Sequence, residues 1–67
     1  MKMNIRALRG YKGLELVNYM NAEFVNMYAV VKDGETLFTD SNESHAYRVY
    51  DREFDKLIEE LKEAGAI

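Results

Sequence analysis

The sequence predicts an α+β domain, in which an antiparallel β-meander of three or four strands precedes one long C-terminal α-helix packed on one sheet face. Two observations support this prediction. An Asp-Gly pair, Asp33 and Gly34, lies between two runs rich in β-branched and aromatic residues, which is a strong β-hairpin signal. An apolar stripe at helical spacing then fills the last third of the chain. We expect one domain over residues 1–67, with the sheet over about 3–39 and the helix over about 42–64.

The first segment, residues 1–13, is basic, and its pattern is ambiguous. Met3, Ile5 and Ala7 alternate as in a strand, whereas Ile5 and Leu8 also fit one helical turn. We interpret the segment as a strand. Gly10 and Gly13 then predict a turn into the next run.

Residues 14–20 predict a second strand, because several of the side chains prefer a pleated surface. Leu14, Leu16 and Met20 would share one side of it, and Val17 and Tyr19 the other. A helical alternative is disfavoured by the asparagines nearby, which are poor helix formers.

The central hairpin spans residues 24–39. With Asp33 and Gly34 as a two-residue loop, Lys32 faces Glu35, Val31 faces Thr36 and Val30 faces Leu37. Both faces of this hairpin are apolar, and one helix can cover only one of them. We expect the helix to cover the more aliphatic side, formed by Val25, Met27, Ala29, Val31 and Phe38.

The opposite side of the hairpin is then predicted to meet a partner, because monomeric domains rarely expose a large aromatic-aliphatic patch. Tyrosine suits such a surface, since it combines a large rigid contact with a polar tip. In the alternative, the N-terminal strand curls back and covers this side. The predicted interface residues are Tyr19, Phe24, Tyr28, Val30 and Leu37.

The C-terminal helix is predicted from caps and from periodicity. Asp40 and Glu43 have the spacing of a capping box, and Gly65 lies where a C′ glycine belongs, with Ala66 placed to contact Leu61. An unbroken apolar stripe runs between these ends. Its members are Ala46, Tyr50, Phe54, Leu57, Leu61 and Ala64, broadened by Tyr47 and Ile58.

Composition limits the function classes. A net charge of −3 disfavours general attraction to nucleic acid, and the absence of cysteine excludes disulfides and thiolate metal sites. No run is long and apolar enough to act as a leader or membrane span, so we expect a soluble, cytoplasmic protein. With no proline, repeat or linker, the chain has the general character of a complete small bacterial or phage accessory protein.

Catalytic constellations are scarce. His45 is the only histidine, and Ser41 and Ser44 beside it are better explained as helix caps than as nucleophiles. Four carboxylates at four-residue spacing form one line on the helix, but interleaved basic residues make a solvated face the simpler interpretation. They are Asp51, Asp55, Glu59 and Glu63. We therefore expect no enzyme activity, no cofactor and no metal.

The sequence predicts a non-enzymatic protein-interaction or regulatory module that binds itself or another protein through the apolar-aromatic sheet face. The alternative is a nucleic-acid-binding regulator, in which cations contact phosphates and an aromatic ring stacks on a base. The same basic residues also suit protection of an exposed sheet edge. The residues concerned are Lys2, Arg6, Arg9, Tyr11 and Lys12.

Overall fold

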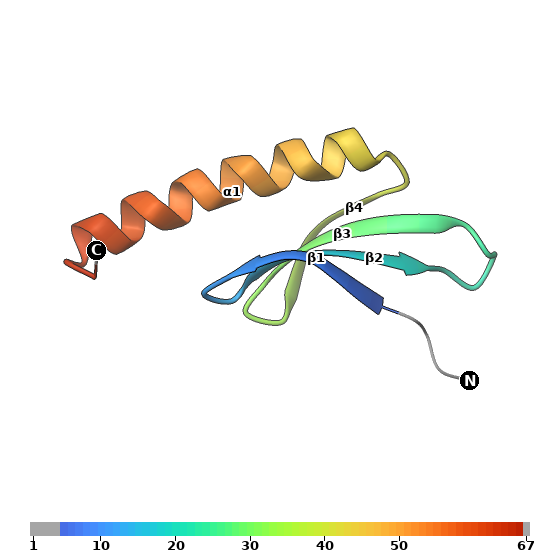
Figure 1. The fold of residues 1–67 in the computed structure, drawn as a ribbon, viewed down its shortest axis with the longest axis horizontal. Coiled ribbons are helices and arrows are strands. Elements are labelled where there is room, and N and C mark those ends of the chain that lie inside the picture. The colour runs from blue at the N-terminus through green and yellow to red at the C-terminus, as the bar shows by residue number, and fades with distance from the viewer. Residues whose placement is uncertain (1–4, 67) are drawn as a thin grey trace.

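The computed structural model describes residues 5–66 and has two layers, a four-stranded sheet and one helix lying across it (Figure 1). The strands pair in chain order, and every pair is antiparallel, which confirms the α+β meander. Residues 5–11 and 14–20 are strands as predicted, and Met3 lies outside the described residues. The elements are β1 (Ile5–Tyr11), β2 (Leu14–Met20), β3 (Asn26–Lys32), β4 (Glu35–Asp40) and α1 (Glu43–Glu63).

Two-residue turns close the first and third hairpins. Asp33 and Gly34 have φ of 51° and 85°, and Lys12 and Gly13 have φ of 45° and 86°, as a type I′ turn requires. The two turns touch, because the Asp33 N–H donates to the Gly13 carbonyl oxygen at 2.9 Å. A Cβ at Gly13 would displace the exposed Asp33 carboxylate, but it is the φ of 86° that makes glycine the favoured residue there.

A β-bulge in β4 overturns part of the predicted register. Lys32–Glu35 and Val31–Thr36 pair as expected, but Val30 pairs with Phe38 rather than with Leu37. Leu37 is the extra residue of the bulge. One added residue shifts Phe38 onto the same sheet face as Val30, which simple alternation does not allow.

The predicted facing of the sheet is therefore wrong. The helix packs on the side that contains Leu14, Leu16 and Val30, each with no exposed surface. Tyr28 and Phe38 pack against this core from the same side. Met27, Ala29 and Val31 alternate with these residues and lie on the other face, while Val25 precedes β3 and is 44% exposed.

The alternative, in which the N-terminal strand covers the side with Tyr28, Val30 and Leu37, is also wrong. The N-terminal strand does not curl back over the sheet, because β1 pairs edge to edge with β2 and extends the same layer. One face of the sheet consequently carries no layer of described chain (Figure 1).

Helix α1 runs unbroken through Asp51 and contributes Ala46, Tyr50 and Leu57 to the core. Its N-cap is Asn42, whose side-chain oxygen accepts from the His45 N–H at 3.1 Å, so the predicted Asp40–Glu43 capping box is wrong. Asp40 ends β4 instead.

The predicted C-terminal end of α1 is confirmed. The Ala66 N–H donates to the Leu61 carbonyl and the Gly65 N–H to the Lys62 carbonyl, with Gly65 at φ 74°. This is the Schellman arrangement, in which a left-handed glycine lets the chain satisfy the last carbonyls.

Candidate interaction surfaces

The sheet face opposite α1, here called the uncovered face, is built from three rows of paired residues. Alternation from the buried Leu14, Leu16 and Val30 assigns each row to this side. The central row is Ala7, Val17, Ala29 and Thr39, the row toward the β2–β3 loop is Ile5, Tyr19 and Met27, and the row toward the turns is Gly10, Glu15, Val31 and Thr36.

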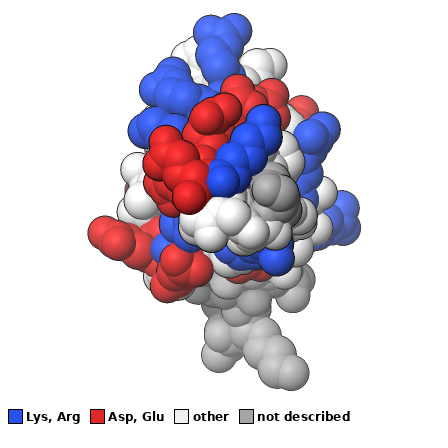
Figure 2. All heavy atoms as spheres, turned by 90° about the vertical axis from the view of Figure 1, so that its left-hand side faces the viewer, with Lys and Arg blue, Asp and Glu red and all other residues white. Residues whose placement is uncertain are grey.

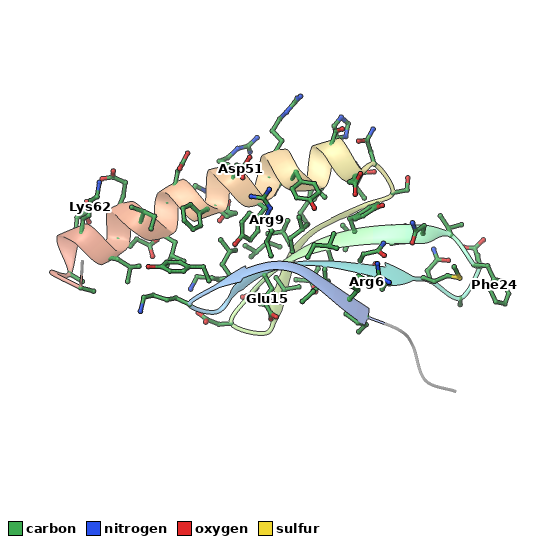
Figure 3. All side chains as sticks on the ribbon, viewed as in Figure 1. Arg6, Arg9, Glu15, Phe24, Asp51 and Lys62 are labelled. Carbon is green, nitrogen blue, oxygen red and sulfur yellow. The ribbon has the colours of Figure 1, made fainter. Side chains whose placement is uncertain are left out.

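The uncovered face is almost free of charge. Glu15 is the only charged side chain in its three rows. Figure 3 shows Glu15 on the side of the sheet away from α1. Ile5 is 62% exposed, whereas Ala29 in the central row is only 4% exposed, shielded by its neighbours on the sheet. The face is therefore apolar, with small side chains at its centre.

Exposed apolar side chains continue from this face onto the β2–β3 loop. Phe24 is 77% exposed at the loop tip (Figure 3), and Val25 beside it is 44% exposed, whereas Met20, which is 48% exposed, lies on the α1 side of the sheet. The Asn21 side-chain oxygen accepts from the N–H groups of Glu23 and Val25 at 2.9 and 3.0 Å, which holds the loop in one shape.

Phe24 itself has φ 61°, in the left-handed region that favours glycine. Its N–H donates to the Asn21 carbonyl at 3.0 Å, so a tight turn places it there. The loop thus holds a large apolar ring in solvent on a strained backbone.

A second surface is an open cleft of about 480 Å³ between β1 and α1. Arg9, Gly10 and Tyr11 line it from the strand, and Tyr50, Asp51 and Phe54 line it from the helix. Arg9 reaches from β1 toward α1, on which Asp51 lies (Figure 3). The cleft therefore has a cation and a carboxylate at its rim and aromatic rings in its wall.

The aromatic wall is held by ring contacts. The Phe54 ring centroid lies 5.5 Å from that of Tyr11 and 6.2 Å from that of Tyr50. The Arg9 guanidinium lies 5.0 Å from the centroid of the Tyr47 ring, which orients it over α1. Burial raises the pKa of Tyr50, and nearby Arg9 opposes that rise only in part.

The predicted interface residues are divided by the fold. Tyr19 lies on the uncovered face, while Phe24 and Leu37 are exposed in the loop and at the β4 bulge. Val30 is fully buried beneath α1, so its assignment to a partner surface is wrong, while Tyr28 lies on the α1 side of the sheet and is partly buried against the core. Sequence reasoning missed Ile5 and Met27, which the cross-strand row with Tyr19 brings together.

The residues proposed for nucleic acid lie along β1 and its turn, apart from Lys2, which is outside the described residues. Arg9 and Tyr11 meet in the cleft, but the Tyr11 ring packs against Phe54, and the Lys12 ammonium lies 5.8 Å from the Tyr11 centroid. These contacts occupy the ring expected to stack on a base. Nucleic-acid binding stays a prediction.

The histidine and the acidic side chains of the described residues form no metal-binding cluster. Among residues 5–66, no three His, Asp or Glu side chains are close enough to hold a metal ion. His45 Nδ1 lies 3.1 Å from Asp40 Oδ2 at the exposed start of α1. Viewed from the end where α1 terminates, basic and acidic side chains are intermixed (Figure 2).

Comparisons with protein-family models, with curated protein sequences and with solved structures find no match. Over the described part of the chain, no helix has the length and apolar character needed to cross a membrane. Any functional inference must therefore start from the uncovered face and the cleft.

Proposed function

We propose that this protein is a small non-enzymatic interaction module that associates with a second copy of itself through the uncovered face. The observation that carries the proposal is the composition of that face, which has one charged residue, Glu15, in its three rows. The cores of protein interfaces are depleted of charge in the same way. A regulatory role would follow from what the dimer presents on its outer surfaces.

The size of the face supports a weak dimer. Four strands about 4.8 Å apart, each six or seven residues long, span roughly 400 Å² of flat sheet. Two copies offer roughly 800 Å², and side-chain relief with Phe24 and Val25 brings the total toward the ~1,200 Å² at the lower limit of stable interfaces. We expect a dissociation constant in the micromolar range.

Shape and charge favour a second copy over a different protein. A two-fold axis can run along the central row. It then places the row toward the β2–β3 loop of one copy, with its large side chains Ile5, Tyr19 and Met27, over the row toward the turns of the other copy, whose side chains are smaller. The single charged residue of the face, Glu15, lies in the row toward the turns, so this axis places the two Glu15 side chains over opposite rows rather than against each other. Sheets pack about 10 Å apart, which small central side chains such as Ala29 permit.

The test is solution mass by light scattering across a wide concentration range, for the wild type and for Met27→Asp. We expect the wild type to pass from monomer to dimer, and Met27→Asp to stay monomeric while keeping its circular dichroism spectrum. Ser41→Asp is the matched control, because it adds the same charge at an exposed position between β4 and α1 and should dimerise normally. A wild type that stays monomeric at millimolar concentration, or a dimer unaffected by Met27→Asp, would overturn the proposal.

A further inference from the structure

We infer that the cleft between β1 and α1 binds a short, extended, acidic peptide, which adds as a fifth strand to the free edge of β1 and inserts an apolar side chain beside Tyr11 and Phe54. This site lies at the edge and on the α1 side of the sheet, and Gly10 is the one residue that it shares with the rows of the uncovered face. An extended peptide laid on an open sheet edge gains affinity from main-chain hydrogen bonds and specificity from a pocket for alternate side chains.

The first step of the argument is the edge itself. The sheet order leaves β1 with a neighbour on one side only. Tyr11 and Leu14 flank a two-residue turn, so they form a hydrogen-bonded pair, and pairs alternate along an antiparallel ladder. The next pair, Gly10 and Glu15, is therefore a non-hydrogen-bonded pair. The N–H and C=O of Gly10 therefore point away from β2, toward the open edge.

The second step is the position of that edge relative to the cleft. Gly10 is itself one of the lining residues, between Arg9 and Tyr11. Main-chain donor and acceptor groups thus lie beside an apolar recess formed by Tyr11, Tyr50 and Phe54. A cleft of about 480 Å³ is larger than one aromatic side chain, so a peptide strand and its anchor fit together.

The third step is the length of the usable edge. The register of β1 is interrupted between Ala7 and Arg9, which makes Leu8 a bulge. Bulges deter long strands from pairing with a sheet edge. Only the segment from Arg9 to Tyr11 offers a regular ladder, which suits a peptide of a few residues better than a seven-residue strand from a second copy.

The fourth step is charge. Arg6, Arg9 and Lys12 lie along β1 and its turn, and Glu15 is the first acidic residue of the chain. No ion pair engages Arg6, Arg9 or Lys12 among the described residues, although Asp51 lies across the cleft from Arg9. A peptide with acidic side chains next to its apolar anchor would supply carboxylates to these cations, which have no ion-pair partner among the described residues.

The probe is a set of seven-residue acetylated peptides in which glutamates flank a central Phe, Leu or Val. Binding is followed by amide chemical shifts of the 15N-labelled protein. We expect shifts at residues 9–11 and at Asp51 and Phe54, weakened at least tenfold when the anchor is replaced by serine. The key control is the same peptide N-methylated at alternate residues, which keeps every side chain but cannot pair as a strand.

Two protein variants test the edge from the other side. Gly10→Pro removes the outward N–H, a change that edge strands tolerate, and should weaken binding at least tenfold. Gly10→Ala keeps the N–H, and its Cβ would meet nothing closer than 3.8 Å, so the effect of Gly10→Pro is measured against this matched variant, which also replaces the glycine but retains the donor. If no peptide binds, or if N-methylated and parent peptides bind equally, the inference is wrong.

The two proposals fail independently. Met27→Asp alters the uncovered face but not the cleft, so a monomeric Met27→Asp protein should still bind the peptide. Gly10→Ala and Gly10→Pro are also measured by light scattering, so loss of binding can be separated from loss of dimer. If Gly10→Pro alters the fold, its loss of binding is not informative. The N-methylated peptide then provides the test, because it is measured on the wild-type protein.

Discussion

Phe24 occupies the position in the β2–β3 loop where any side chain opposes folding. A left-handed backbone costs a residue with a Cβ about 1–2 kcal/mol, and the 77% exposed ring recovers little of this by packing. We predict that Phe24→Gly raises the free energy of unfolding by about 1 kcal/mol, measured by urea denaturation. Phe24→Ala is the control, because it removes the ring and keeps the strain.

The same variant separates stability from association. If Phe24 extends the apolar surface of the dimer, Phe24→Gly should fold more stably and yet associate more weakly. A glycine variant no more stable than the alanine variant would show that the loop relaxes out of the left-handed conformation in solution.

Asp40 provides a second prediction at the residue scale, because its hydrogen bonds favour the ionised form. The Asn42 N–H donates to Oδ1 at 3.0 Å and His45 Nδ1 lies 3.1 Å from Oδ2, and these contacts lower the pKa of Asp40 below 3.8. The resulting stabilisation is complete above pH 3.8, the value for the unfolded chain, and is lost as the pH falls through the lower folded-state pKa.

Asp40→Asn should therefore be less stable than the wild type at pH 7, and the difference should shrink as the pH is lowered below 3.8. The urea midpoint of each protein is measured as a function of pH, from pH 7 down to the lowest pH at which both proteins still fold. Parallel curves over this range would show that the Asp40 contacts do not form in solution.

At the scale of the element, the bulge decides which side chains β4 gives to the core. Without Leu37, Thr36 and Phe38 would be neighbours in a regular strand and would keep their present partners, Val31 and Val30. We predict that deletion of Leu37 keeps the fold at a cost below about 1.5 kcal/mol, measured by thermal and urea denaturation. It should also straighten the edge and increase aggregation, seen by light scattering.

The matched control is deletion of Ala29, which lies in β3, a strand paired on both sides without interruption at this residue. Losing one residue there moves Tyr28 and the residues before it to the opposite face, so this variant should not fold. If the proteins with Leu37 deleted and with Ala29 deleted were equally stable, the pairing with β3 would not fix the register of β4.

The same bulge explains how far the sequence could predict the fold. Turns and caps depend on a few adjacent residues, and Asp33–Gly34 and Gly65 were predictable because only their φ values matter. The face covered by α1 depends on which side of a doubly apolar hairpin fills the space beneath Tyr50 and Leu57. Alternation alone cannot locate the extra residue of a bulge such as Leu37, so it places Phe38 and Val30 on opposite faces.

The candidate surfaces were predictable to a different degree. An uncovered apolar face could be predicted from the excess of apolar side chains, but its residues could not, since Val30 belongs to the core and Tyr28 packs against it. The cleft joins Arg9 to Asp51, which are far apart in the chain. No short-range pattern indicates that β1 lies at the edge beside α1.

The whole molecule is an open two-layer structure rather than a closed one. Its Cα radius of gyration is 13.1 Å, against about 11 Å for a compact domain of this length. If a second copy closes the open side, folding and association are linked. We predict a melting temperature that rises by about 3–5 °C per tenfold increase in concentration above the dissociation constant.

Met27→Asp should melt at a temperature that does not depend on concentration, while Ser41→Asp should follow the wild type. A wild-type melting temperature that stays constant over this concentration range would show that association does not contribute to the stability of the fold.

The strand order also bears on how fast the protein reaches this structure. Every strand pairs with the next one along the chain, so each hairpin can form from residues that are already close in sequence. Folding rates rise as contacts become more local, and the chain contains no proline whose isomerisation would add a slow phase. Refolding from urea should therefore be complete well within a second, which leaves a newly made chain little time with its apolar strands unpaired.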